Sequence, residues 1–67
     1  MNEDDYKRAL NGDKNLQGVD LKGANLKGAN FRYADLKGAN LVRADLRNAD
    51  LRGQNLDDLK SRGAIIN

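Results

Sequence analysis

Residues 24–51 read ANLKGANFRYADLKGANLVRADLRNADL, and a single five-residue pattern fills this stretch. Working outward from it, a large apolar residue occupies every fifth position from Leu16 to Leu56, nine times in succession. An Asn or Asp precedes each of these nine residues, and an Ala or Val stands two positions before seven of them. A pattern this strict is an internal repeat, and the repeat decides the fold.

A period of five matches neither regular element of secondary structure. An α-helix repeats about every 3.6 residues and a strand about every two, so neither keeps all the apolar residues on one face. A chain that turns a corner every five residues does keep them pointing inward. The recurring Asn and Asp suit such corners, because their side chains hydrogen-bond to nearby backbone. The periodicity therefore predicts a solenoid with a Leu and Ala interior and a polar exterior.

The motif Ala-(Asn/Asp)-Leu-x-x resembles the pentapeptide repeat family, closely over residues 24–51 and more loosely over residues 15–56. The resemblance implies an all-β solenoid, namely a right-handed quadrilateral β-helix. One repeat would form each side, and the Leu or Phe and the small residue two before it would point inward. With four repeats to a coil, residues 15–56 would make about two and a half coils within one domain spanning residues 1–67.

Four repeats per coil would stack residues that are twenty positions apart. The Asn and Asp columns then read Asn15/Asp35/Asn55, Asp20/Asn40, Asn25/Asp45 and Asn30/Asp50. No Asp lies over another Asp. Coils about 4.8 Å apart would make two stacked carboxylates repel by roughly 1 kcal/mol, and the alternation avoids this. The same spacing predicts an inward column of Leu16, Leu36 and Leu56.

The residues before the repeats predict a capping helix over residues 3–11. Asn2 is a candidate N-cap, and three acidic residues follow it, where they suit the helix dipole. Tyr6, Ala9 and Leu10 have the spacing of one apolar stripe, which we expect to lie on the first coil. An open coil end needs such a cover, because it exposes apolar side chains and unpaired backbone.

Residues 57–67 predict a second cap, which includes a short helix. Asn55 is its candidate N-cap, and Gly63 is placed to stop it. The chain continues with Ile65, at an Asx position, and Ile66, which returns to the apolar phase of the repeat. Two interpretations stay open. Ile65 and Ile66 plug the end of this molecule, or they form, with Leu59, an interface to another protein.

The small size of the chain favours a protein partner. A domain of 67 residues with no cysteine rarely has a free energy of unfolding above ~3–5 kcal/mol unless a disulfide or a bound metal stabilises it. Self-association or docking on a larger assembly would supply stability. The resemblance points the same way, because members of the family commonly dimerise through their C-terminal region. We therefore expect a protein partner, which is a second copy bound through the C-terminal end or a multi-subunit assembly.

The composition argues against an enzyme. The chain has no Cys and no His, which removes thiolate ligands, the commonest metal ligand and the usual acid–base side chain. The adjacent carboxylates at residues 4–5 and 57–58 are interpreted as helix caps. We predict no catalytic, cofactor-binding or metal-binding residue and no small-molecule substrate. No apolar run nears the ~20 residues that cross a bilayer, and the acidic N-terminus is unlike a signal peptide, so we expect a cytoplasmic protein without membrane contact.

The position after each Leu is mostly basic, and this stripe carries the alternative functional prediction. The candidate residues for contact with nucleic acid or another anion are Lys27, Arg32, Arg47 and Arg52 of this stripe, together with the nearby Arg43. Two observations weigh against that alternative. Asp45 and Asp50 are placed to balance the charge, and Tyr33 is the single aromatic expected on this surface, so base stacking is poorly supplied.

Some members of the family mimic double-stranded DNA and bind type II topoisomerases such as DNA gyrase. That mimicry depends on a long acidic rod, whereas this chain is short and has a net charge of +2. Its electrostatics therefore disfavour gyrase binding. The sequence analysis predicts a non-enzymatic binding or structural module, whose rigid sides and C-terminal end contact a protein.

Overall fold

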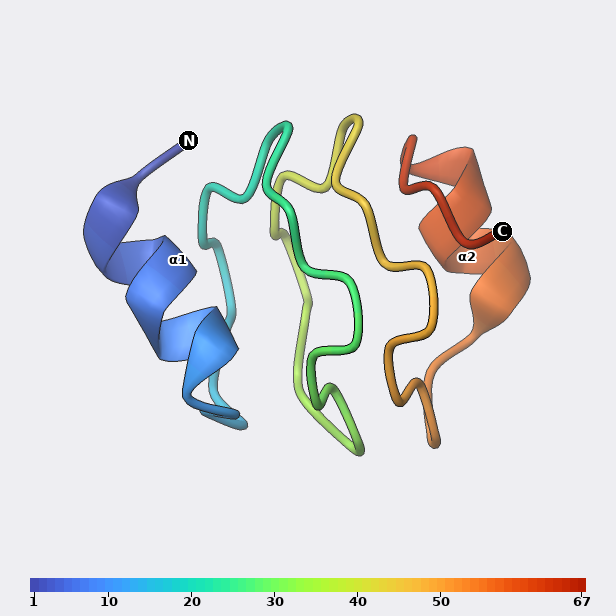
Figure 1. Ribbon diagram of the computed structural model, residues 1–67, viewed down its shortest axis with the longest axis horizontal. Helices are drawn as coiled ribbons and strands as arrows, with labels where there is room; N and C mark the ends of the chain where they lie inside the picture. The colour runs from blue at the N-terminus through green and yellow to red at the C-terminus, as the bar shows by residue number, and fades with distance from the viewer.

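The computed structural model describes all 67 residues, and two short helices stand at its opposite ends (Figure 1). Helix α1 spans Glu3–Leu10 and helix α2 spans Leu56–Ser61. The repeats between them contain turns and no continuous strand. Isolated parallel bridges join the successive windings, and they link Asn15 to Asp35, Asp20 to Asn40, Asn25 to Asp45, Asn30 to Asp50 and Asp45 to Ile65. The predicted all-β solenoid is therefore seen only as single bridges, because a turn interrupts the chain in every repeat.

Each bridge joins residues twenty positions apart, so four repeats complete one winding. We call residues 15–34 coil 1 and residues 35–54 coil 2. Backbone hydrogen bonds between the coils keep this register on every side, as shown by Leu21 N–H to Asn40 O at 2.9 Å and Gly23 N–H to Val42 O at 2.8 Å. Four of the five bridges pair an Asn with an Asp, which confirms the predicted alternation within these two coils.

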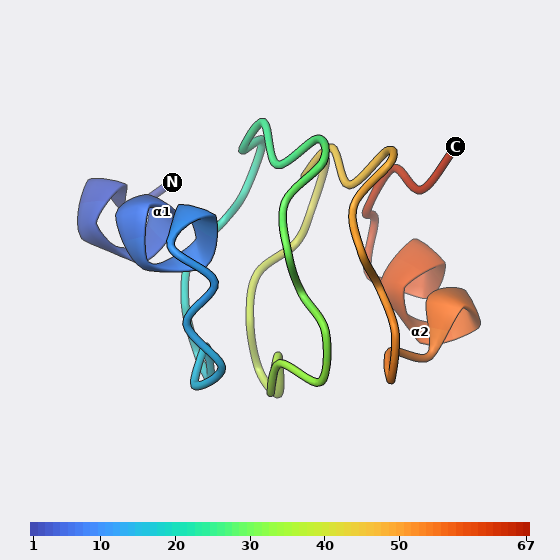
Figure 2. The same cartoon turned by 60° about the horizontal axis from the view of Figure 1, so that its bottom comes forward.

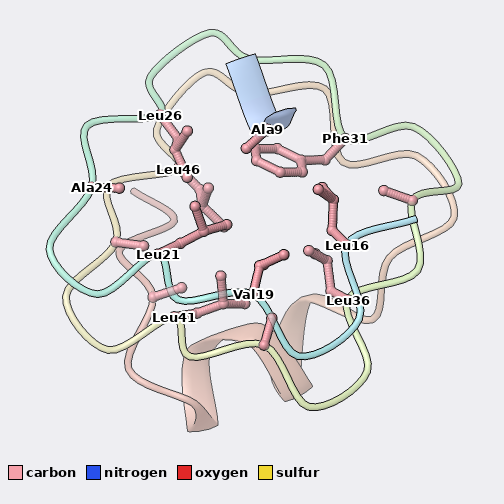
Figure 3. Close-up of a cluster of buried hydrophobic side chains, with 14 of the residues drawn as sticks. Ala9, Leu16, Val19, Leu21, Ala24, Leu26, Phe31, Leu36, Leu41 and Leu46 are labelled. Carbon is pink, nitrogen blue, oxygen red and sulfur yellow. The ribbon is translucent and has the colours of Figure 1, made fainter. Parts of the chain in front are cut away.

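The core is a column of apolar side chains enclosed by the windings (Figure 3). All fifteen buried residues are apolar. Leu side chains from three sides and Phe31 from the fourth converge toward the centre, and the Ala at the small position leaves room for them. The inward prediction for Leu56 is wrong, because this residue begins α2 and its surface is 44% exposed. The column therefore contains Leu16 and Leu36 without a third Leu from this position.

The corners are built as the sequence predicts. In Asp20, for example, Oδ1 accepts a hydrogen bond from Lys22 N–H at 3.1 Å, and the same bond recurs along the repeats. When each repeat is counted from its Leu or Phe, its third residue has a positive φ, from Gly18 to Gly53. Glycine occupies most of these positions. Tyr33, Arg43 and Asn48 adopt the same left-handed conformation, with φ of 55°, 58° and 61°. A side chain at such a position costs about 1 kcal/mol more than glycine does.

Helix α1 covers the open side of coil 1 (Figure 2). Side-chain packing and hydrogen bonds hold it there. Asn2 caps the helix, because its Oδ1 accepts from Asp5 N–H at 3.0 Å. Ala9 is fully buried, and Tyr6 Oη donates to the carbonyl of Asn25 at 3.0 Å. The predicted apolar stripe is wrong at Leu10, which is the last helical residue and is 50% exposed. The chain turns away at this point, and so Leu10 does not reach the core.

Helix α2 replaces one repeat above coil 2 without shifting the register. Asn55 caps it by accepting from Asp58 N–H at 3.0 Å. After the helix, Arg43 N–H donates to Gly63 O at 2.9 Å and Ile65 N–H donates to Ala44 O at 2.8 Å. The chain thus returns to the twenty-residue spacing. Leu59, on the buried side of α2, packs into the core.

Two polar side chains donate to backbone carbonyls of the coils. In a further coil, backbone N–H groups would have donated to these carbonyls. In coil 2, Asp35 N–H donates to Lys14 O and Asn40 N–H donates to Val19 O. The corresponding carbonyl one coil later, Ala34 O, accepts from Gln54 Nε2 at 2.7 Å. The next one, Ala39 O, accepts from Arg62 Nη2 at 2.8 Å. The departure of Gln54 from the repeat therefore has a structural reason, whereas the role of Arg62 could not be predicted from the repeat pattern.

Candidate functional site

The structure brings four of the five predicted basic residues together in two groups, each around one carboxylate. Asp45 Oδ2 lies 3.9 Å from Lys27 Nζ and 2.8 Å from Arg47 Nη2. Asp50 lies 3.6 Å from Arg32 Nε and 3.2 Å from Arg52 Nε. In each group one cation comes from coil 1 and the other from coil 2. The expected balancing by Asp45 and Asp50 is therefore present, and each group keeps one surplus positive charge.

The two groups differ in how many guanidinium nitrogens of each arginine contact the aspartate. Arg47 holds Asp45 through two bonds, from Nε at 3.0 Å and from Nη2 at 2.8 Å. The side-chain hydrogen bond from Arg47 lowers the pKa of Asp45 from 3.8 to about 2. Arg32 and Arg52 approach Asp50 through Nε alone, and their terminal Nη groups donate no hydrogen bond within the chain. Those Nη groups are free to bind a further acceptor.

Arg43, the fifth predicted basic residue, stands apart from both groups. Its side chain makes no ion pair, and its backbone packs beside Gly63, where the chain leaves α2. The structure therefore does not assemble the five predicted residues into one continuous basic face. Lys27, Arg32, Arg47 and Arg52 lie on neighbouring repeats, and Arg43 belongs to the preceding one.

Tyr33 is the most exposed of the large hydrophobic residues, at 71%. Its ring lies against Gly53, the residue one coil later. A hollow of about 290 Å³ opens beside it, lined by Lys14, Asn30, Arg32 and Tyr33. The sequence analysis missed Lys14. Its signal is the spacing, because Lys14 precedes Ala34 by twenty positions and its carbonyl accepts from Asp35 N–H.

The predicted C-terminal interface residues have three different environments. Leu59 is 1% exposed, so the prediction that it contacts a partner needs correction: it fills the end of this molecule's own core. Ile66 is half-buried and packs against the core. Ile65 points away from the core and is 42% exposed. Of the three, Ile65 is the side chain most accessible to another protein.

The adjacent carboxylates lie in the first turns of the two helices, and Ser61 is the last residue of α2. Asp5 Oδ2 accepts from Asp20 N–H at 2.9 Å, which ties α1 to coil 1. Asp58 Oδ2 accepts from Arg62 Nη1 at 3.2 Å, and Ser61 Oγ donates to Asp58 O at 2.7 Å. No three residues among the His, Cys, Asp and Glu side chains are grouped as metal ligands would be. No helix is long and apolar enough to cross a membrane.

Comparison with known proteins gives one match. A family model described as pentapeptide repeats matches residues 15–53, in eight copies. No curated protein and no solved structure matches the chain.

Proposed function

Because the chain belongs to the pentapeptide repeat family, we propose that it is a non-enzymatic module that binds a protein or has a structural role. We further propose that its windings form a right-handed quadrilateral β-helix. The twenty-residue register and the one bridge per repeat support this architecture. Such a frame holds its outward side chains on fixed backbone, which lowers the entropy lost when a partner binds.

The observation that carries the protein-binding proposal is an exposed apolar side chain at the coil end where backbone N–H groups are unpaired. In coil 1, Phe31 N–H and Tyr33 N–H donate to carbonyls of coil 2. The equivalent groups of coil 2, Leu51 N–H and Gly53 N–H, donate to no backbone carbonyl. Ile65 lies in the last paired segment and is exposed. Free N–H groups and an exposed apolar side chain at one coil end suit pairing with a second chain.

Sedimentation equilibrium on the wild type and on Ile65→Asp tests this proposal. A second copy bound at this edge predicts a dimer that Ile65→Asp dissociates. Leu10→Asp is the matched control, because Leu10 is equally apolar and exposed but lies at the opposite end. A dimer that both variants leave intact would contradict an interface at Ile65. A monomeric wild type would exclude a second copy and restrict the proposal to a foreign protein.

A second candidate function is weak contact with nucleic acid. The terminal guanidinium nitrogens of Arg32, Arg43 and Arg52, which make no hydrogen bond within the chain, favour it. Retention on immobilised double-stranded DNA measures it directly. Binding through these arginines predicts retention that persists at ~0.15 M salt and falls steeply at higher salt. Loss of all retention at ~0.15 M would exclude this function.

A further inference from the structure

We infer that Lys14, Arg32, Tyr33 and Arg52 form a binding surface for the carboxylates of an acidic segment of a protein partner. We call these four residues the Tyr33 surface. The inference deepens the proposed function and rests on it, since it takes the partner to be a protein. It concerns a different part of the molecule from Ile65, and so the two can fail separately.

The charge of the Tyr33 surface favours an anionic ligand. Lys14, Arg32 and Arg52 bring three positive charges, and Asp50 is the one carboxylate paired with them. Lys14 is exposed and makes no ion pair. A surplus of two positive charges thus remains on a small area.

The unused guanidinium groups specify the kind of anion. Asp50 occupies only the Nε side of Arg32 and Arg52, which leaves the Nη donors of both free. A free planar fork of N–H donors matches a carboxylate in a bidentate arrangement. Arg47 shows the same fit inside the molecule, because it holds Asp45 with Nε and Nη2 together. The Nε and Nη2 donors of Arg47 are therefore already bound to Asp45, whereas the free Nη donors of Arg32 and Arg52 can bind a further carboxylate.

Tyr33 itself gives an independent indication of binding. Its φ of 55° is a left-handed conformation that glycine adopts at the equivalent position Gly53 of coil 2. The tyrosine therefore strains the backbone and buries little of its own surface, since 71% of it is exposed. Only one face of the ring packs, against Gly53, and strain that is retained for so small a packing gain points to a role outside the fold. Tyrosine and arginine are also the residues that most often dominate protein interfaces.

The hollow beside the ring offers polar backbone to the same ligand. It measures about 290 Å³, and Asn30 lines it together with Lys14, Arg32 and Tyr33. The backbone N–H and C=O of Asn30 make no hydrogen bond within the chain. A peptide bound here would therefore meet a backbone donor and acceptor as well as the cations. Nucleic acid fits less well, because one aromatic ring provides a single stacking position.

An NMR titration of the full chain tests the inference. ¹H–¹⁵N spectra, including the arginine Nε–H signals, are recorded at ~0.15 M salt with three probes: acetyl-hexaglutamate amide, acetyl-hexaglutamine amide and a ten-nucleotide oligothymidylate. We expect hexaglutamate to shift the signals of Asn30, Arg32, Tyr33 and Arg52 before those of Arg47. The neutral hexaglutamine should shift none of them. Hexaglutamate shifts spread equally over all basic residues, or no shifts, would overturn the inference.

Two variants with matched controls separate the binding surface from the fold. Lys14→Gln should weaken hexaglutamate binding about tenfold, the loss of one charge-assisted contact. Lys22→Gln, which removes the same charge from an exposed side chain elsewhere, should leave binding unchanged. Tyr33→Gly should weaken binding by a similar factor without lowering stability, and Asn48→Gly is its control because Asn48 shares the left-handed conformation.

The remaining outcomes are equally decisive. Equal weakening by Lys14→Gln and Lys22→Gln would reduce the effect to net charge and overturn the inference. Tighter binding of oligothymidylate than of hexaglutamate at the same residues would replace a protein ligand by nucleic acid. A failure of these tests together with a dimer sensitive to Ile65→Asp would remove the Tyr33 surface and leave the proposed function intact.

Discussion

The ring of Tyr33 occupies the space that a side chain on Gly53 would need. A Cβ built on Gly53 would lie 2.5 Å from Tyr33 Cδ1 and 2.9 Å from Cε1. Both residues have positive φ and stand at equivalent positions of successive coils. The glycine of coil 2 therefore gives the tyrosine of coil 1 a flat backbone platform, and it fixes one face of the ring while the other stays in solvent.

Gly53→Ala is expected to destabilise the chain by about 2 kcal/mol, because it adds left-handed strain and displaces the Tyr33 ring. Gly18→Ala is the matched control, since Gly18 has a similar φ of 70° but no atom within 4 Å of its would-be Cβ. We expect Gly18→Ala to cost about 1 kcal/mol, from strain alone. Urea denaturation measures both. Equal losses of stability for Gly53→Ala and Gly18→Ala would show that the ring does not rest on Gly53. A loss for Gly53→Ala that stays the same in a Tyr33→Gly background would show the same.

Gln54→Ala restores the repeat pattern, yet we expect it to lower the free energy of unfolding by about 1–2 kcal/mol. The side chain donates to two part-buried carbonyls, Phe31 O at 3.2 Å and Ala34 O at 2.7 Å. The substitution leaves both without that donor. Gln17→Ala removes an exposed amide that bonds to Asp35 and should change stability by less than about 0.5 kcal/mol. Stabilisation by Gln54→Ala in urea denaturation would refute the capping role.

Leu59→Ala and Leu56→Ala test the corrected positions of two leucines in α2. Leu59 fills the end of the core, so we expect its truncation to cost about 2–4 kcal/mol. Leu56 lies on the exposed side of the helix, and its truncation should cost less than about 1 kcal/mol. Thermal unfolding followed by circular dichroism compares the two. A larger loss of stability for Leu56→Ala than for Leu59→Ala would show that Leu56 points into the core.

The pKa of Asp45 predicts a specific acid dependence. Arg47 lowers this pKa to about 2, from an ordinary value of 3.8, so folding favours the ionised carboxylate. Its contribution to stability is complete above pH 3.8 and is lost as the pH falls through about 2. The wild type should therefore lose more stability than Asp45→Asn over that interval, as measured by urea denaturation at each pH.

Two other groups limit the size of that difference. The pKa of Asp13 is lowered, first by the backbone N–H of Asn15, and that of Asp35 is lowered, first by the amide of Gln17. Asp45→Asn therefore keeps part of the acid sensitivity. Asp57→Asn removes the same charge from a carboxylate without an ion pair and serves as the control. Identical pH curves for the wild type and Asp45→Asn would contradict the pairing with Arg47.

The repeat made much of the molecule predictable, because each of its positions has one local task. The Leu turns inward, the Asx side chain bonds two residues ahead, and the spacing of twenty stacks an Asn over an Asp. Asn2 and Asn55 were also identified as N-caps from their local sequence, and both cap their helices. The right-handed quadrilateral β-helix was predicted from the family resemblance, and the structure has isolated bridges between turns.

The candidate site was harder to predict, because contacts between distant residues decide it. The basic stripe and Tyr33 follow from the sequence. The spacing of twenty does not say that Arg47 grips its carboxylate with two nitrogens while Arg32 and Arg52 use one each. It also did not bring Lys14 into the set, since this lysine precedes the first clear repeat.

The sequence by itself determined the repeat and the inward direction of its Leu residues, since these depend on short-range periodicity that every repeat enforces. The register of twenty was predicted from the family resemblance, and the bridges between the coils confirm it. Only the tertiary structure decided how the ends close and which cations stay free. Helix α2 turns Leu59 rather than Leu56 into the core, and Arg62 reaches Leu36 O and Ala39 O at 2.6 and 2.8 Å. The physical reason is that an end has no following repeat to supply hydrogen bonds, so the pairing there depends on which side chains the fold brings within reach.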